Sequence, residues 1–129
     1  MSNDGHTDRV NCVRWVSENI FLSSSADKSI IVWKEAEDSS TSNRYEPIVK
    51  LKGHSSTVTV VDGVLLRDGN ILVASASGDS TLKLWSARKK KLNTDLPGHG
   101  DDIYAVDWSP DGQKVVSGGK DKVLRIWRK

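Results

Sequence analysis

Apolar and polar residues alternate along this chain in short runs, and no long segment repeats apolar residues at helical spacing. A period of two is typical of a strand with one buried face, and the runs are rich in valine and isoleucine, which favour strands. The clearest runs are Val10–Trp15, Val58–Val64 and Ile103–Trp108. The pattern predicts an all-β chain of short antiparallel strands.

The same succession of features occurs three times. Each copy opens with Gly-His, passes through two strand-like runs to an aspartate, and ends on a tryptophan six residues later. A third run precedes each tryptophan, at Ile30–Val32, Leu82–Leu84 and Leu124–Ile126. Self-similarity of this kind indicates stacked structural repeats. We expect residues 1–129 to form one domain with repeats at approximately 5–34, 53–86 and 98–128.

The connections predict hairpins and one long loop. Arg67–Asn70 and Pro110–Gly112 are typical hairpin turns, because Gly and Asn tolerate positive φ. Further runs at Ile48–Leu51 and Leu92–Leu96 give four strands per repeat, and the last repeat lacks its outer strand because the sequence stops just after Trp127. The polar, acidic residues 35–46 predict a solvated loop. A regulatory phosphosite is an alternative role for Ser39, Ser40, Thr41 and Ser42.

The Gly-His, Asp and Trp positions resemble the WD-repeat family of β-propellers over nearly the whole chain. The closing tryptophan is followed by Lys34, Ser86 or Arg128, where the family pattern has aspartate. The resemblance implies blades of four-stranded antiparallel sheets, in this chain an incomplete propeller. It also implies a buried hydrogen-bonded tetrad in each repeat: His6, Ser23, Asp27 and Trp33; His54, Ser75, Asp79 and Trp85; His99, Ser117, Asp121 and Trp127.

Histidine, serine and aspartate are also the residue types of a catalytic triad, so a hydrolase is the competing interpretation. The tetrad fits a structural role better, because Trp donates, Ser donates and accepts, His bridges through two nitrogens and Asp accepts. A nucleophile also needs an oxyanion site and an open pocket, and the sequence indicates neither. We therefore expect no catalytic residues and no enzyme.

The resemblance also implies a partner-binding face. In the family, the third and fifth residues after the Gly-His histidine and the residue before the turn aspartate face partners. The matching positions are Arg9, Asn11 and Ala26; Thr57, Thr59 and Gly78; Asp102, Tyr104 and Lys120. Arg9 and Tyr104 are favoured, because Arg and Tyr are enriched in binding hot spots. The alternative is that these are ordinary solvent-facing residues.

Two narrower resemblances concern different parts of the chain. Residues 92–129, with Asp95–His99 and Tyr104–Trp108, resemble the final repeat of Notchless-type ribosome assembly factors. Residues 5–85, with His6–Val13 and Ser23–Trp33, resemble the opening blades of the second subunit of the Elongator complex. They imply a non-enzymatic scaffold, either in tRNA wobble-uridine modification or in ribosome biogenesis. A designed or recombined propeller fragment with a purely structural role is the alternative.

Composition and charge narrow the setting. A net charge of +2 is too small to indicate nucleic acid or a membrane surface. No apolar run approaches the roughly 20 residues of a membrane-spanning helix, and the N-terminus lacks a signal-peptide core. The single cysteine, Cys12, excludes an internal disulfide, and its apolar surroundings favour a buried thiol over a reactive one. An intracellular, cytoplasmic or nuclear location fits best.

Other candidate chemistry is weak. The three histidines have no cysteine or clustered carboxylate at ligand spacing, so neither zinc nor another cofactor is expected. The basic run Arg88–Lys91 is interpreted as a solvated turn, with a nuclear-import or RNA-contacting patch as the alternative. We expect Trp15 and Trp108 to be blade-packing residues and not stacking platforms for bases.

Three repeats are too few to close a propeller, which typically needs four to eight blades. Unpaired blade faces and sheet edges favour association. We expect the chain either to form a homo-oligomer, with two copies giving six blades, or to be an excerpt of a larger propeller. Its partners would be other proteins or further copies of itself.

Overall fold

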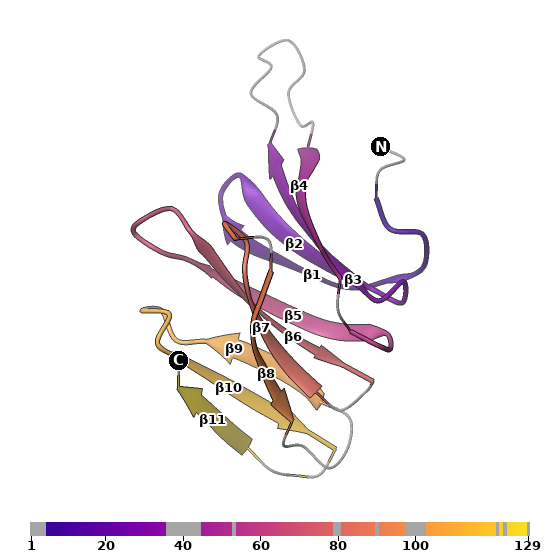
Figure 1. The fold of residues 1–129 in the computed structure, drawn as a ribbon, viewed down its shortest axis with the longest axis vertical. Helices are drawn as coiled ribbons and strands as arrows, with labels where there is room; N and C mark the ends of the chain where they lie inside the picture. Colours follow the sequence, from indigo (N-terminus) through magenta and orange to yellow (C-terminus); the bar gives the residue numbers. More distant parts are fainter. Residues whose placement is uncertain are drawn as a thin grey trace.

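The computed structural model describes residues 5–35, 45–52, 54–78, 81–89, 91–97, 103–120, 122 and 124–128. These residues form three separate antiparallel sheets, which we call blades 1 to 3 (Figure 1). Blade 1 contains β1 (Val10–Ser17), β2 (Ile20–Ser25), β3 (Ser29–Glu35) and β4 (Tyr45–Lys52). Blade 2 contains β5 (Val58–Leu65), β6 (Ile71–Ser77), β7 (Thr81–Ser86) and β8 (Lys91–Pro97). Blade 3 contains β9 (Ile103–Trp108), β10 (Lys114–Gly119) and β11 (Leu124–Arg128).

The strands of each blade follow one another in chain order. The predicted all-β fold is confirmed, including a last blade of three strands where the first two have four. The blades lie one against the next, so that β1 contacts β5 and β5 contacts β9 (Figure 1). No helix long and apolar enough to cross a membrane occurs in the part of the chain that the structure describes.

Strand alternation gives every blade two different faces. In blade 1, Ser23 pairs with Val13 and Ile31, so these three side chains share one face. We call the side that carries Ser23, Ser75 or Ser117 the serine face of its blade, and the opposite side the aliphatic face. In blade 1 the aliphatic face carries Leu22, which pairs with Val32.

The apolar core lies between blades rather than inside any one sheet. One cluster joins Leu22, Ile30 and Val32 of blade 1 to Val73 and Trp85 of blade 2. A second cluster joins Leu72, Ala74, Leu82 and Leu84 of blade 2 to Ile103, Val106, Trp108 and Val115 of blade 3. Each joint therefore packs the serine face of one blade on the aliphatic face of the blade before it.

Gly63 allows the first joint to close tightly. A Cβ at this position would lie 2.6 Å from Leu22 Cδ1 and 3.2 Å from Val16 Cγ2. Blades 1 and 3 carry Trp15 and Trp108 at the same place in their first strands. A glycine is needed in blade 2, because side chains of blade 1 already fill that space.

The two tryptophans behave differently from each other. Trp108 is buried in the second joint, as predicted. Trp15 packs within its own blade only, and 63% of its surface is exposed. No other blade formed by the described residues packs on the serine face of blade 1, and Trp15 packs edge-on against Phe21 and Tyr45 of its own sheet.

The turns follow the predicted chemistry. Gly69 and Gly112 have φ of 89° and 74°, in the two hairpin turns where positive φ was expected. The predicted loop 35–46 is too long at both ends, because Glu35 ends β3 and Tyr45 begins β4. Residues 36–44, which include the four candidate phosphosites of this loop, lie outside the described residues.

Candidate functional site

The structure brings the four residues of the first tetrad together. The Trp33 indole Nε1–H donates to Ser23 Oγ over 2.8 Å, and Ser23 Oγ lies 2.6 Å from His6 Nε2. On the other side of the ring, His6 Nδ1 lies 3.0 Å from Asp27 Oδ2. This chain of hydrogen bonds connects the loop before β1 with β2, the β2–β3 turn and β3.

Asp27 anchors one end of this chain. Its Oδ2 accepts from the Thr7 backbone N–H over 3.0 Å, and its Oδ1 accepts from the Ser29 hydroxyl over 2.5 Å. Burial alone would raise the pKa of Asp27, but the bonds from Ser29, Thr7 and His6 outweigh it and hold this pKa well below its ordinary value of 3.8. The carboxylate is therefore ionised and acts as an acceptor only.

An ionised Asp27 fixes a proton on the facing nitrogen of His6. Since Asp27 accepts, His6 Nδ1 carries a proton toward it, and in the neutral ring His6 Nε2 accepts from the Ser23 hydroxyl. Ser23 Oγ in turn accepts from Trp33. The donors and acceptors of all four groups are satisfied, which suits a buried network.

The same directions would suit a catalytic triad, but Ser23 is only 3% exposed. A nucleophilic oxygen must meet its substrate, and Ser23 Oγ lies between His6 and Trp33 inside the blade. In this geometry the tetrad can fix loops to strands and cannot present an attacking group.

The second and third tetrads are partly described. In blade 2, Trp85 Nε1 donates to Ser75 Oγ over 2.8 Å, and His54 Nε2 lies 2.7 Å from the same oxygen. In blade 3, Trp127 Nε1 donates to Ser117 Oγ over 3.0 Å. Asp79, His99 and Asp121 lie outside the described residues. The Trp-to-Ser bond is common to the three blades.

Two of the proposed partner-facing residues bond to the neighbouring blade. Asn11 Nδ2 donates to the Val58 carbonyl over 3.0 Å, from blade 1 to blade 2. Thr59 Oγ1 lies 3.4 Å from the Ile103 carbonyl, from blade 2 to blade 3. Both residues are exposed, yet their polar atoms serve the joints.

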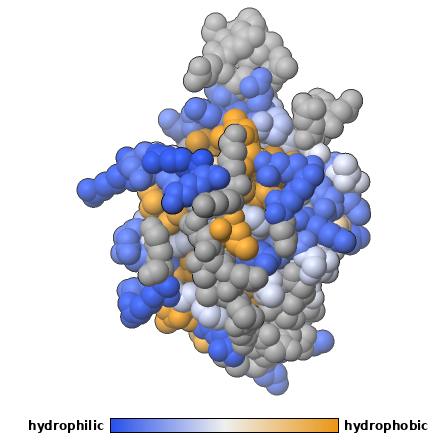
Figure 2. Space-filling view, in the orientation of Figure 1, coloured by the Kyte–Doolittle hydropathy of each residue, from blue (hydrophilic) through white to orange (hydrophobic). Residues whose placement is uncertain are grey.

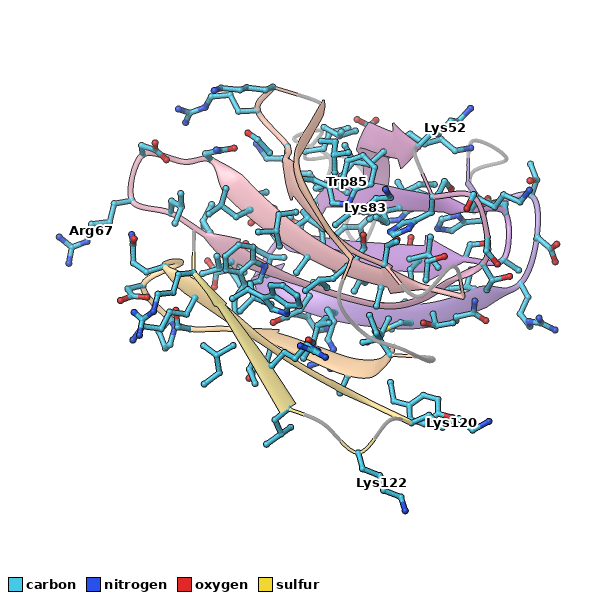
Figure 3. The ribbon with its side chains drawn as sticks, turned by 60° about the horizontal axis from the view of Figure 1, so that its bottom comes forward. Lys52, Arg67, Lys83, Trp85, Lys120 and Lys122 are labelled. Carbon is cyan, nitrogen blue, oxygen red and sulfur yellow. The ribbon has the colours of Figure 1, made fainter. Side chains whose placement is uncertain are left out.

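The other proposed face residues have different surroundings. Arg9 and Lys120 are exposed, as is 63% of Tyr104, whereas Thr57 and Ala26 are half-buried. The Arg9 carbonyl accepts from the Ala26 N–H over 2.8 Å, which fixes the Arg9 backbone to the β2–β3 turn. Gly78 is exposed, and Asp102 lies outside the described residues. Figure 3 shows Lys52, Lys120 and Lys122 at one end of the blades and Arg67 at the other.

Sequence reasoning missed one buried polar group at a joint. Asp62 on β5 is buried, and its Oδ2 accepts from the Trp108 backbone N–H of β9 over 2.9 Å. Burial is the main cause that raises the pKa of Asp62, and a hydrogen bond that its protonated carboxyl donates to Asp107 adds to the rise. Val-Asp recurs at Asp62 and Asp107, immediately before Gly63 and Trp108, and this shared offset was the available signal.

The remaining candidates from the sequence are metal ligands, the basic run at residues 88–91 and Cys12. No group of three or more His, Cys, Asp or Glu side chains that could hold a metal ion occurs among the described residues. Arg88 and Lys89 are exposed in the β7–β8 turn, where the Arg88 guanidinium donates to the Asp68 carbonyl. Lys90 lies outside the described residues. Cys12 is half-buried between the two core clusters.

Comparison with known proteins agrees with this geometry. The family model of the WD domain, G-beta repeat, matches residues 1–34, 45–86 and 89–128. Each matched segment contains the first three strands of one blade, and the second and third also contain the outer strand of the blade before.

The relatives with names include Elongator complex protein 2 and a nuclear distribution protein. The chain is 35% identical to Elongator complex protein 2 of Dictyostelium discoideum over 82% of its own length and 13% of that protein's. It is 42% identical to Elongator complex protein 2 of Drosophila melanogaster over 63% of the chain and 10% of that protein. It is 34% identical to the nuclear distribution protein nudF of Aspergillus flavus over 96% of the chain and 26% of that protein.

The chain therefore spans about a quarter or less of the length of these relatives. The family model covers most of the chain in three segments, and each segment includes strands of one successive blade. The chain belongs to the WD-repeat family of β-propeller proteins.

Proposed function

We propose that the chain is a non-enzymatic scaffold that binds another protein in a multi-subunit complex, through side chains at the end of the blades where Arg9 lies. The observation that carries this proposal is the fixed position of the Arg9 loop. Thr7 N–H donates to Asp27, and the Arg9 carbonyl accepts from Ala26, so the loop is bonded on both sides of its exposed arginine. A preordered side chain loses little entropy on binding.

Arg9, Tyr104 and Lys120 are the residues proposed to contribute most to partner binding. All three are exposed, and Arg and Tyr are residue types enriched in hot spots. Asn11 and Thr59 contribute less, because their polar atoms already bond to backbone carbonyls of the next blade. Thr57 is half-buried and serves mainly as backbone support for Gly78, whose N–H donates to the Thr57 carbonyl over 3.0 Å.

The proposed setting is an intracellular complex of the Elongator type, in tRNA wobble-uridine modification. Support comes from the named similarity to Elongator complex protein 2 of two organisms. A ribosome-assembly role is the second candidate and rests on the resemblance of residues 92–129 alone. Residues 1–129 are proposed to act as one domain, with further blades of a second copy or of a larger propeller packed against blades 1 and 3.

Affinity purification from cell extract tests the scaffold role. The tagged chain should capture a defined set of proteins, and Elongator subunits among them would support the proposed complex. The double variant Arg9→Ala, Tyr104→Ala should capture at least about tenfold less, since a hot-spot residue contributes ~2 kcal/mol or more. Arg67→Ala, at the opposite end of the blades, is the matched control and should capture as much as the unaltered chain (Figure 3).

Pre-ribosomal proteins in the captured set would replace the Elongator assignment with ribosome assembly. Capture of nothing beyond the chain itself would contradict the scaffold role and favour a purely structural propeller fragment. Equal loss of capture in Arg67→Ala and in the double variant would show that binding does not use the Arg9 end.

A further inference from the structure

Four basic side chains extend from the loops and turns at the Arg9 end of the blades. Arg9 lies in the loop before β1, Lys28 lies in the β2–β3 turn, and Lys120 and Lys122 lie in the β10–β11 turn. All four side chains are exposed. Figure 3 shows Lys120 and Lys122 pointing away from blade 3, and Figure 2 shows hydrophilic side chains along the right side of the molecule, where the β2–β3 turn lies in Figure 1. This end therefore presents positive charge from blades 1 and 3.

The exposure of this end does not depend on where the chain begins or ends. Blade 2 contacts blade 1 and blade 3, and Gly78 in its β6–β7 turn is exposed all the same. Gly78 matches Lys120 of blade 3, since each residue directly precedes the turn aspartate of its repeat. Ser55, in the loop before β5, is exposed as well. The turns at this end thus face solvent even in a blade that has a neighbour on each side.

Lys28 and Lys122 occupy the same unusual backbone position. Their φ values are 72° and 66°, in the left-handed region that residues other than Gly, Asn and Asp rarely adopt. In each turn the lysine N–H donates to the carbonyl three residues before it, to Ser25 over 3.2 Å and to Gly119 over 3.1 Å. Glycine would make the same backbone bond with less strain. The turn therefore gives no reason for lysine, whereas a partner that binds the exposed ammonium group does.

Few negative charges oppose these cations. Among the described residues of this end, Asp8 is the one exposed acid, and its Oδ1 accepts from the Arg9 backbone N–H over 2.7 Å. The Asp27 side chain is 6% exposed, and the tetrad and its turn already occupy its oxygens. No ion pair to any of the four basic side chains occurs within the part of the chain that the structure describes. Their charges are available to a partner.

The middle of this end, which blade 2 forms, carries no exposed charge among the described residues. Ser55 and Gly78 are exposed there, and Thr57 is half-buried. A Cβ at Gly78 would lie 2.9 Å from Ser56 Oγ, so glycine keeps the surface close to the backbone at this point. Positive charge therefore occurs in two pairs, one on blade 1 and one on blade 3, with an uncharged strip between them.

We propose that the partner at the Arg9 end presents an extended polypeptide segment with two runs of Asp or Glu, whose carboxylates pair with the cations of blade 1 and of blade 3. Packed sheets lie about 10 Å apart, so the segment needs about six extended residues between its acidic runs to cross blade 2. Complementary charge guides the encounter of two proteins and fixes their register. The proposal rests on the proposed scaffold role and specifies the chemistry of its partner.

A nucleic acid strand fits this arrangement less well. It carries a phosphate at every nucleotide, and it gains much of its affinity from many phosphate contacts. Two pairs of cations with an uncharged strip between them offer few such contacts, and the net charge of the whole chain is only +2. A polypeptide can place its carboxylates only where the cations lie.

Fluorescence anisotropy of a labelled peptide tests this proposal on the purified chain. The probe carries three glutamates at each end and uncharged serine and glycine residues between them, and its control has glutamine in place of every glutamate. The acidic peptide should bind with an affinity that falls as salt is added, because salt screens exposed ion pairs. The glutamine peptide should not bind.

Variants at the two strained turns locate the binding. Lys28→Gly and Lys122→Gly remove both ammonium groups and suit the positive φ of their turns, so the double variant should keep its fold by circular dichroism. It should bind the acidic peptide about tenfold more weakly, since an exposed ion pair is worth roughly two- to fivefold in affinity. The matched control Arg67→Ala, Lys89→Ala removes two exposed cations from the opposite end and should bind as the unaltered chain does.

Equal binding of the acidic and glutamine peptides would overturn the proposal, and so would an equal loss of binding in the two double variants. An RNA strand that binds more tightly than the acidic peptide, and that the Lys28→Gly, Lys122→Gly variant weakens, would assign this end to nucleic acid instead. Capture of proteins through Arg9 and Tyr104 without binding of the acidic peptide would refute the partner chemistry and leave the scaffold role standing. Binding of the acidic peptide without capture of any protein would support the basic surface and contradict the scaffold role.

Discussion

Individual carboxylates make opposite contributions to stability in this molecule. Asp27 accepts bonds from Thr7, Ser29 and His6, so its charged form is favoured on folding. Asp62 is buried at a joint, so its charged form is disfavoured even though Trp108 donates to it. The residue type is the same, and the surroundings decide the sign.

The first prediction concerns acid. Folding lowers the pKa of Asp27 below its ordinary value of 3.8. At pH values around and just below 3.8, the unfolded chain therefore binds more protons than the folded chain. The contribution of Asp27 is therefore fully present above about pH 4 and is lost as the pH falls below it. Urea unfolding of the unaltered chain and of Asp27→Asn should differ most at neutral pH, and the gap should narrow in acid. A gap independent of pH would contradict the assigned charge.

The second prediction separates charge from hydrogen bonding at Asp62. Its raised pKa means that the stability it contributes is present below 3.8 and falls as the pH rises through the folded-state pKa. Asp62→Asn keeps an acceptor for the Trp108 N–H and removes the buried charge, so it should stabilise the chain at neutral pH. Asp62→Ala leaves that N–H unpaired and should cost ~1–3 kcal/mol. Equal unfolding free energies for the two variants would show that the bond contributes nothing.

At the scale of strands, the sequence pattern predicted the strands and the turns but not the contacts between blades. Alternation and turn glycines were sufficient for the strands and hairpins, because both signals are local. The positions that depend on a neighbouring blade were not predictable in this way. Asn11 and Thr59 were interpreted as surface residues, and their bonds to Val58 and Ile103 follow from contacts between strands far apart in sequence.

Trp15 shows that the sequence around a residue does not by itself determine its burial. Its sequence context matches that of Trp108, and the two residues occupy equivalent places in β1 and β9. Only the arrangement of blades determines that one is buried and the other exposed. The first tetrad was accessible from the family resemblance, because its residues recur at fixed offsets, whereas the Asp62 bond required the fold.

The third prediction concerns the close approach of blades 1 and 2. Gly63→Ala would place a methyl group 2.6 Å from Leu22 Cδ1, so the joint must open or Leu22 must leave its rotamer. Overpacking of this kind costs ~1–3 kcal/mol. Leu22→Val removes the δ carbons, so the double variant should lose less stability than the sum of the two single changes. Chemical unfolding of the four proteins gives this coupling, and strict additivity would show that the blades do not meet at Gly63.

At the scale of the whole molecule, the residues that stabilise the fold and the residues proposed to contact a partner are separate sets. The cores and tetrads join strands within a blade and blades to one another, and their polar atoms point inward. Arg9, Tyr104 and Lys120 extend into solvent from loops and strand ends that these bonds hold in place. The proposed scaffold role requires this division, because residues that contact a partner could then change without loss of the fold.

Thermal unfolding of Asp27→Ala and Arg9→Ala beside the unaltered chain tests this division most directly. Asp27→Ala leaves Thr7, Ser29 and His6 without their acceptor, a loss of ~1–3 kcal/mol, and should lower Tm by several degrees. Arg9→Ala removes an exposed side chain and keeps the backbone bond to Ala26, so its Tm should stay within about 1 °C of the original. A fall in Tm for Arg9→Ala with none for Asp27→Ala would contradict the account.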